Sequence, residues 1–169
     1  MSDEITFTEQ NRGAAWERYI RKQNDELKKA GIADVRKNWE APTVPGHDHL
    51  RREPSAPDFS GAAIVGGRVV PVMFEAKSVQ SGDKFRHSRL NGDQLDDLTF
   101  RASLGGISFV YVLSGDLEQY VLRVDSDGNI DATEPGCKYS NLIDGFRRQP
   151  GETWHDVICR FGWTGGCCE

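Results

Sequence analysis

The chain has 169 residues, a length that suits one folded domain around a single core. Hydrophobic residues make up 37% and charged residues 28%, which excludes a disordered chain, and no apolar run is long enough to cross a bilayer. The net charge of −5 argues against a protein that coats nucleic acid by bulk attraction. The first ten residues lack the apolar segment of a secretory signal, so we expect a cytoplasmic protein with no membrane partner.

The charge is unevenly distributed along the chain. Residues 12–37 hold eight Lys or Arg side chains against four acids, whereas residues 116–134 hold six acids and one base, Arg123. This asymmetry is compatible with a local surface for a polyanion. A solvated helix face would have the same composition, so the pattern alone does not separate the two.

The first elements are a helix, a short strand and a loop. Residues 8–30 are predicted to be helical because apolar residues recur at helical spacing, with Thr8 as the cap and Gly31 as the stop. A short strand is expected over 35–39. Residues 40–57 contain four prolines, which indicates a loop or an extended arm.

The clearest local signal is a β-hairpin. Residues 58–65 and 68–77 are β-rich runs on either side of Gly66-Gly67, and a two-residue Gly-Gly connection between such runs is typical of a hairpin. Pro71 has no N–H group, so we expect a bulge or a free edge at that point of the second strand.

The hairpin brings charged residues together at its open end. Regular pairing outward from the turn places Asp58 opposite Glu75, on one face of the sheet. Lys77 lies two residues beyond Glu75 and points to the same face. A bulge at Pro71 would shift this register by one residue.

The second half of the chain predicts a helix and another hairpin. Residues 91–104 form the helix, which Gly105-Gly106 ends. Residues 107–113 are apolar enough for a strand buried on both faces, and residues 119–124 are its hairpin partner. Residues 125–129 superficially resemble a calcium loop but lack the closing Glu, so we interpret them as a turn.

The tail completes the predicted organisation. A short helix is expected over 140–148. The whole chain, residues 1–169, is then one α/β domain built on a mixed β-sheet flanked by helices, with an arm at 40–57 and a C-terminal extension from about residue 135.

Four cysteines, at positions 137, 159, 167 and 168, form no C-x-x-C pair. We interpret them as reduced thiols. A zinc site that combines His155, Cys159 and the terminal pair is an alternative, although the spacing fits no standard pattern.

Two carboxylates opposite one another repel, and a hard divalent cation is the natural compensation. Magnesium commonly binds one or two carboxylates together with water and substrate phosphate. A nearby lysine such as Lys77 can orient the water and stabilise developing charge. The alternative interpretation is an exposed ion pair between Glu75 and Lys77 with no function.

These residues match a known signature. Pro57-Asp58 followed by Glu75-Ala76-Lys77 matches the PD-(D/E)xK nuclease motif, and within that superfamily the chain resembles the RecU-like Holliday-junction resolvases. The resemblance covers roughly residues 11–112. Its matching stretches, in the family's order, are Asn11-Arg12-Gly13, Glu17, Asp58-Phe59-Ser60-Gly61, Phe74-Glu75-Ala76-Lys77, Gln94 and Gly105-Gly106-Ile107-Ser108-Phe109.

The resemblance implies a restriction-endonuclease-like core, a homodimer, and cleavage of DNA phosphodiesters that depends on magnesium or manganese. It assigns Asp58 and Glu75 as metal ligands, with the carbonyl of Ala76 as a third. Lys77 would act on the attacking water and Glu17 would reach the site from the first helix. Gln94 would orient Lys77 or the scissile phosphate.

The expected partner is DNA, and a four-way junction in particular. The expected phosphate contacts are Arg12, Arg51, Arg52, Lys84, Arg86 and Arg89. Solvated loops would also account for these basic residues.

Two departures from the family bear on the substrate. Only residues 40–57 fill the place of the family's long stalk, and Asp93 replaces a frequent His before the helix Gln. The short arm leaves two alternatives open. One is another PD-(D/E)xK nuclease acting on flaps, nicks or ends in DNA repair or phage replication, and the other is an inert DNA-binding module.

Overall fold

The computed structural model describes residues 6–8, 10–38, 56–131 and 137–163. Its helices are α1 (Arg12–Lys29), α2 (Gly92–Ser103) and α3 (Trp154–Arg160), with single 3-10 turns at His87–Arg89 and Asp144–Phe146. Its strands are β1 (Ala33–Lys37), β2 (Phe59–Val65), β3 (Arg68–Ser78), β4 (Lys84–Arg86), β5 (Ile107–Leu113), β6 (Gln119–Val124) and β7 (Tyr139–Asn141).

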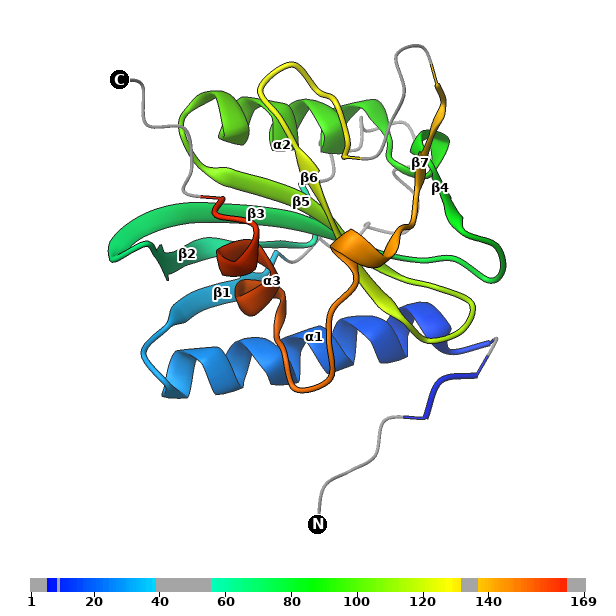
Figure 1. Cartoon of the computed structure of the whole chain (residues 1–169), viewed down its shortest axis with the longest axis horizontal. Coiled ribbons are helices and arrows are strands. Elements are labelled where there is room, and N and C mark those ends of the chain that lie inside the picture. The colour runs from blue at the N-terminus through cyan, green and yellow to red at the C-terminus, as the bar shows by residue number, and fades with distance from the viewer. Residues whose placement is uncertain (1–5, 9, 39–55, 132–136, 164–169) are drawn as a thin grey trace, which may run out of the picture.

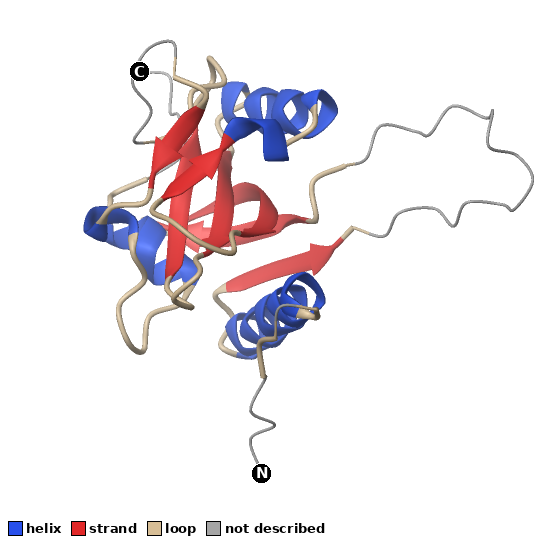
Figure 2. Cartoon of the chain, turned by 90° about the vertical axis from the view of Figure 1, so that its right-hand side faces the viewer, coloured by secondary structure: helices blue, strands red, loops and turns tan. Residues whose placement is uncertain are grey.

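Five strands form one mixed sheet in the order β1-β2-β3-β5-β6. β3 and β5 run parallel and are connected through α2, while the other neighbouring pairs are antiparallel. β4 and β7 form a separate two-stranded sheet. Figures 1 and 2 both show α1 and α2 on opposite sides of the main sheet. The predicted α/β class, a mixed sheet flanked by helices, is confirmed.

The sheet has an apolar core on each face. On one face, Trp16 of α1 and Trp154 of α3 pack against the aromatic side chains of the central strands. On the other face, Leu98 of α2 packs with Val110 and Val112 of β5. Every residue of β5 is buried, as its apolar sequence predicted.

The hairpin has the predicted register. Val65 pairs with Arg68 next to the turn, and Phe59 pairs with Phe74 at the far end. Gly66 and Gly67 both have positive φ, 58° and 76°, which a tight two-residue turn requires.

Pro71 produces no bulge, because it pairs with Ala62 in an unbroken register. The pairing of β3 with β5 starts only at Val72, so the β5 side of Pro71 carries no ladder bond that its missing N–H could break. The other expectation, that the strand has a free edge at Pro71, agrees with the structure, because β5 does not pair with β3 at this residue.

The N-terminal predictions need small corrections. α1 starts at Arg12 and not at residue 8, because Thr8 and Asn11 exchange hydrogen bonds across a turn that precedes the helix. Thr8 is therefore not the cap. β1 covers Ala33–Lys37, two residues earlier than expected, and Trp39 lies outside the described residues.

The prediction of a helix over 140–148 is wrong. That segment holds the end of β7 and a single 3-10 turn, because residues near Ser140 pair with β4. The helix of the tail is α3, which the sequence analysis missed. Its signal was Thr153 followed three residues later by Asp156, which together form a capping box.

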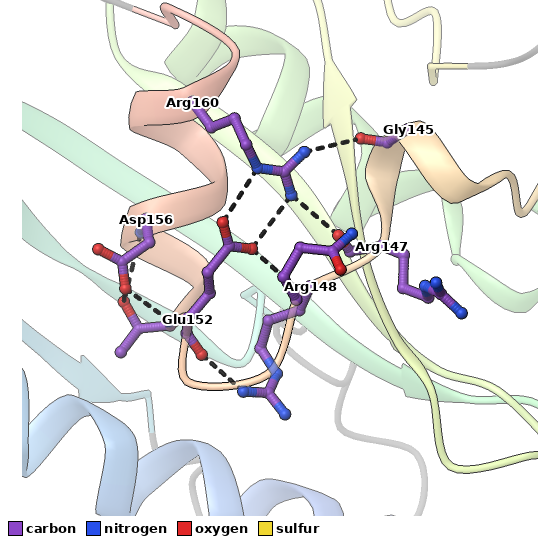
Figure 3. A network of polar contacts seen from close by, with 8 residues as sticks. Gly145, Arg147, Arg148, Glu152, Asp156 and Arg160 are labelled. Atoms are coloured by element: carbon purple, nitrogen blue, oxygen red, sulfur yellow. Dashed lines mark hydrogen bonds and ion pairs between the residues drawn. The ribbon is translucent and has the colours of Figure 1, made fainter.

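Polar contacts within the tail hold the segment before α3 against that helix (Figure 3), and Trp154 connects α3 to α1. Arg160 of α3 binds the Glu152 carboxylate at 3.1 Å and donates to the carbonyl of Arg147 at 2.9 Å. Trp154 is fully buried and donates from Nε1 to Asn24 of α1 at 2.8 Å. None of the helices in the described part of the chain is long and apolar enough to span a membrane.

Gly61 is required where β1 passes close to β2. A Cβ at this position would overlap the carbonyl oxygen of Asp34 and lie 2.8 Å from Cα of Val35. We expect Gly61→Ala to lower the free energy of unfolding by about 1–3 kcal/mol, because the β1 backbone would have to move away.

Urea unfolding measures this difference, and Gly13→Ala is the matched control. A Cβ at Gly13 meets nothing within 4 Å, and alanine is favoured over glycine inside a helix. A Gly61→Ala protein as stable as the wild type would contradict the close packing of β1 on β2.

Candidate active site

Asp58 and Glu75 face each other at the open end of the hairpin. The backbone N–H of Asp58 donates to Glu75 Oε2 at 3.0 Å, and the N–H of Ala76 donates to Asp58 Oδ2 at 3.0 Å. The Glu75 side chain is only 2% exposed. The opposition predicted from the register is therefore present, and backbone donors hold both carboxylates in place.

Lys77 and Gln94 both contact the carboxylate of Glu75. Lys77 Nζ lies 2.7 Å from Glu75 Oε1, and Gln94 Nε2 donates to the same oxygen at 2.7 Å. The other end of the Gln94 amide accepts from the N–H of Asn91, which completes the capping box of α2. The structure therefore places Gln94 against Glu75, and its contacts with described residues do not include Lys77.

Burial and neighbouring negative charge raise the pKa of both carboxyl groups. Loss of solvent, followed by the charge of Asp58, raises the pKa of Glu75 to about 7 against the opposing effect of Lys77. Burial also raises the pKa of Asp58, against the N–H of Ala76, which lowers it. The pair therefore retains a proton at pH values where exposed carboxyl groups have lost theirs.

Glu17 lies at the edge of this cluster. Its negative charge raises the pKa of Asp58, and its carboxylate forms an ion pair with Lys37 at the end of β1. Lys37 was not singled out by the sequence analysis. No pattern of neighbouring residues indicates that Lys37 lies near the site. Only the pairing of β1 with β2 brings Lys37 beside Phe59 and the adjacent Asp58.

Asn38 is a second residue that the sequence analysis missed. Its backbone N–H donates to the carbonyl of Asp58 and its side chain donates to the carbonyl of Pro57, both at 2.7 Å. Its amide oxygen accepts from Ser60 Oγ at 2.8 Å. Asn38 thus ties the segment that carries Asp58 to the end of β1.

The donor set fits a hard cation that retains several water ligands. Two carboxylates suffice for magnesium, which completes its coordination with water and phosphate. Asp58 Oδ1 accepts no hydrogen bond from a described residue, so a lone pair is available there. Within the described ranges, no three His, Cys, Asp or Glu side chains converge as a metal cluster.

The sequence also suggested a zinc site in the tail and a superficial likeness to a calcium loop at residues 125–129. The zinc alternative needs Cys167 and Cys168, which lie outside the described residues, while Cys159 Sγ is 3.7 Å from His155 Nε2. At residues 125–129 the side chain of Asp125 accepts from backbone N–H groups of its own loop. That loop is the predicted turn.

The structure brings four of the six predicted phosphate-contact residues together. Arg12, Lys84, Arg86 and Arg89 line one cavity of about 470 Å³ beside the end of β3. Arg51 and Arg52 lie outside the described residues.

Comparisons with known proteins find a likeness among solved structures only. No protein-family model matches the sequence, and no curated protein matches it. Among solved structures, Hjc from the hyperthermophilic archaeon Archaeoglobus fulgidus, a Holliday junction resolvase, aligns over 86% of this chain and 98% of its own. The identity is 18% and the TM-score is 0.45. This likeness alone assigns neither an activity nor a residue role to the present chain.

The raised pKa of Glu75 predicts a pH-dependent stability. The folded protein holds a proton on Glu75 up to about pH 7, whereas the unfolded chain releases it near the ordinary value of 4.5. The free energy of unfolding of the metal-free protein should therefore fall as pH rises through this window, by on the order of 3 kcal/mol.

Urea unfolding in EDTA between pH 5 and pH 8 measures this loss, with Glu75→Gln as the comparison. The glutamine variant carries no titrating group at this position, so its stability should gain on the wild type as pH rises. Parallel pH profiles for the two proteins would contradict the raised pKa.

Proposed function

We propose that this protein is a metal-dependent DNA endonuclease of the PD-(D/E)xK type, and most specifically a Holliday-junction resolvase. The observation that carries the proposal is the opposed Asp58–Glu75 pair, in which Glu75 is buried and contacts Lys77. An exposed ion pair without function would not require two carboxylates opposed at a buried strand end. The order of helix, three antiparallel strands, helix and parallel strand supports a restriction-endonuclease-like core.

The residues present supply the parts of a phosphodiester hydrolysis site. Asp58 and Glu75 would hold magnesium or manganese, with the Ala76 carbonyl as a further ligand. When bound, such a cation neutralises charge on the phosphate and lowers the pKa of water. Lys77 places its side-chain nitrogen at the site, where it can orient the attacking water and stabilise negative charge on the phosphate.

The remaining residues position these groups. Gln94 holds Glu75 Oε1 from the first turn of α2 and so fixes the carboxylate relative to Lys77. Asn38 holds the backbone on which Asp58 is carried. Glu17 adds a third carboxylate at the edge of the cluster, balanced by Lys37.

The substrate and the assembly follow from the family resemblance. A resolvase cuts two strands symmetrically, which requires two active sites and hence a homodimer. Four-way-junction DNA is therefore the expected partner in recombination and repair. Selectivity of the protein for junctions would have to come from residues 40–57, which stand in the place of the family's long stalk.

A substrate panel tests this assignment. The purified protein is incubated with magnesium and an immobile four-way junction, a flap or a linear duplex of matched sequence. Paired symmetric nicks in the junction alone would support a resolvase. Preferential cleavage of the flap or duplex would retain the nuclease and reject the resolvase. No cleavage with either magnesium or manganese would favour an inert DNA-binding module.

The site residues have their own test. We expect Glu75→Gln and Lys77→Gln each to lower the cleavage rate by about 10²- to 10⁴-fold, because the first removes a ligand of the proposed metal and the second removes the group that would orient the attacking water. Lys29→Gln, which removes a charge from the exposed end of α1, is the control and should cleave normally. Circular dichroism verifies that each variant is folded. Full cleavage by folded Glu75→Gln would overturn the site assignment.

A further inference from the structure

A cavity of about 470 Å³ opens beside the end of β3, the strand that carries Glu75 and Lys77. Three segments that are distant in the sequence line it: the start of α1, residues 78–81 after β3, and the segment 84–89 that contains β4. Figure 1 shows the start of α1, the β3–β4 connection and the β5–β6 turn on the same side of the molecule. Ser78 directly follows Lys77, so the cavity and the candidate active site share one strand.

The cavity concentrates positive charge in an acidic protein. The described residues of its lining include Arg12, Lys84, Arg86 and Arg89 and no Asp or Glu, although the chain carries a net charge of −5. Lys84, Arg86 and Arg89 form no ion pair with any residue in the described ranges. Four unneutralised cations around one concave space attract an anion, because each gains favourable Coulomb energy from the same ligand.

Arg12 is held in position before any ligand binds. Its Nη2 donates to the carbonyl oxygens of Ser114 and Gly115 in the β5–β6 turn. Its Nε is buried and has no hydrogen-bond partner among the described residues, so one donor remains unused. The turn itself packs tightly, since a Cβ at Gly115 would lie 2.6 Å from the carbonyl oxygen of Gln80.

The size and the donor types define the ligand. Guanidinium groups bind phosphate oxygens through paired N–H donors. A volume of 470 Å³ falls in the range of sites for whole small molecules, so the cavity accommodates a phosphate together with part of a nucleotide.

We infer that this cavity is a metal-independent subsite for a backbone phosphate of the DNA strand. The subsite anchors the strand that continues from the cleavage position. The inference rests on the proposed function for its choice of DNA as the ligand. It differs from the active site in that its cations need no bound metal to attract the phosphate. Its loss therefore weakens binding and raises KM, while the chemical step stays intact.

The test measures binding without metal. Association of the four-way junction is followed by fluorescence anisotropy in EDTA between 50 and 200 mM salt, for wild type and for Arg86→Gln/Arg89→Gln. Both side chains are exposed, so their replacement leaves the core unchanged. We expect the slope of log K against log salt to fall in magnitude by about 1, because the loss of one phosphate contact removes about 0.9.

The control is Lys29→Gln/Arg21→Gln, which removes the same charge from exposed positions on α1 outside the cavity lining. The control should keep the wild-type slope. Equal slopes for all three proteins would overturn the subsite. So would equal losses in the cavity variant and the control, because net charge alone would then explain the effect.

Direct binding of small phosphate compounds distinguishes a DNA phosphate from a free nucleotide as the ligand. Calorimetry with inorganic phosphate and with dAMP should show weak binding to the wild type that the cavity variant loses. Tight dAMP binding that the cavity variant loses, with DNA binding unchanged, would make the cavity a free-nucleotide site and overturn the DNA assignment.

Glu75→Gln separates this inference from the proposed function. That variant retains the cavity, so it should bind DNA in EDTA with the wild-type slope even though its cleavage with magnesium is strongly slowed. If the wild type never cleaves but the cavity variant still loses slope, the subsite stands and the nuclease assignment falls. If the wild type cleaves and the cavity variant has unchanged slope and KM, the subsite falls and the nuclease stands.

Discussion

The rest of the structure depends on two carboxyl groups held face to face at the end of a buried hairpin. Both groups lose solvent, which raises the pKa of each, and the charge of Asp58 raises the pKa of Glu75 as well. Reciprocal backbone hydrogen bonds keep them opposed, since each strand supplies an N–H to the carboxylate of the other. A native protein tolerates such a pair where a cation or a shared proton relieves the repulsion, which is why this cluster carries the proposed function.

Several elements contribute to holding that pair. The Gly66-Gly67 turn sets the register that opposes the two residues, and β1 supports the Asp58 segment through Asn38. α2 adds Gln94, whose amide both caps its helix and contacts Glu75. Gln94 therefore stabilises α2 and positions Glu75 at the same time. A movement of α2 would displace the Glu75 carboxylate directly.

The charges of the chain separate into different environments. On the basic segment 12–37, Lys28 and Arg36 pair with Asp34, and Lys37 pairs with Glu17, which leaves less free positive charge than the count of residues indicates. The cavity beside β3 has four cations and, in the part of the chain that the structure describes, no lining acid. A protein with a net negative charge can thus present a concentrated positive site, because long-range charge and local charge act over different distances.

The sequence by itself determined the local features. The Gly-Gly dipeptide set the hairpin and hence the opposition of Asp58 and Glu75, and an unbroken apolar run identified β5 as the buried strand, because turn chemistry and hydrophobic pattern act between near neighbours. Only the tertiary structure decided which distant segments meet. Lys37 and Asn38 reach the site through the pairing of β1 with β2, Arg12 joins Arg86 and Arg89 through the packing of α1 against the β5–β6 turn, and residues near Ser140 become a strand because β4 is there to pair with them. These outcomes depend on contacts between residues far apart in the chain, which no local pattern encodes.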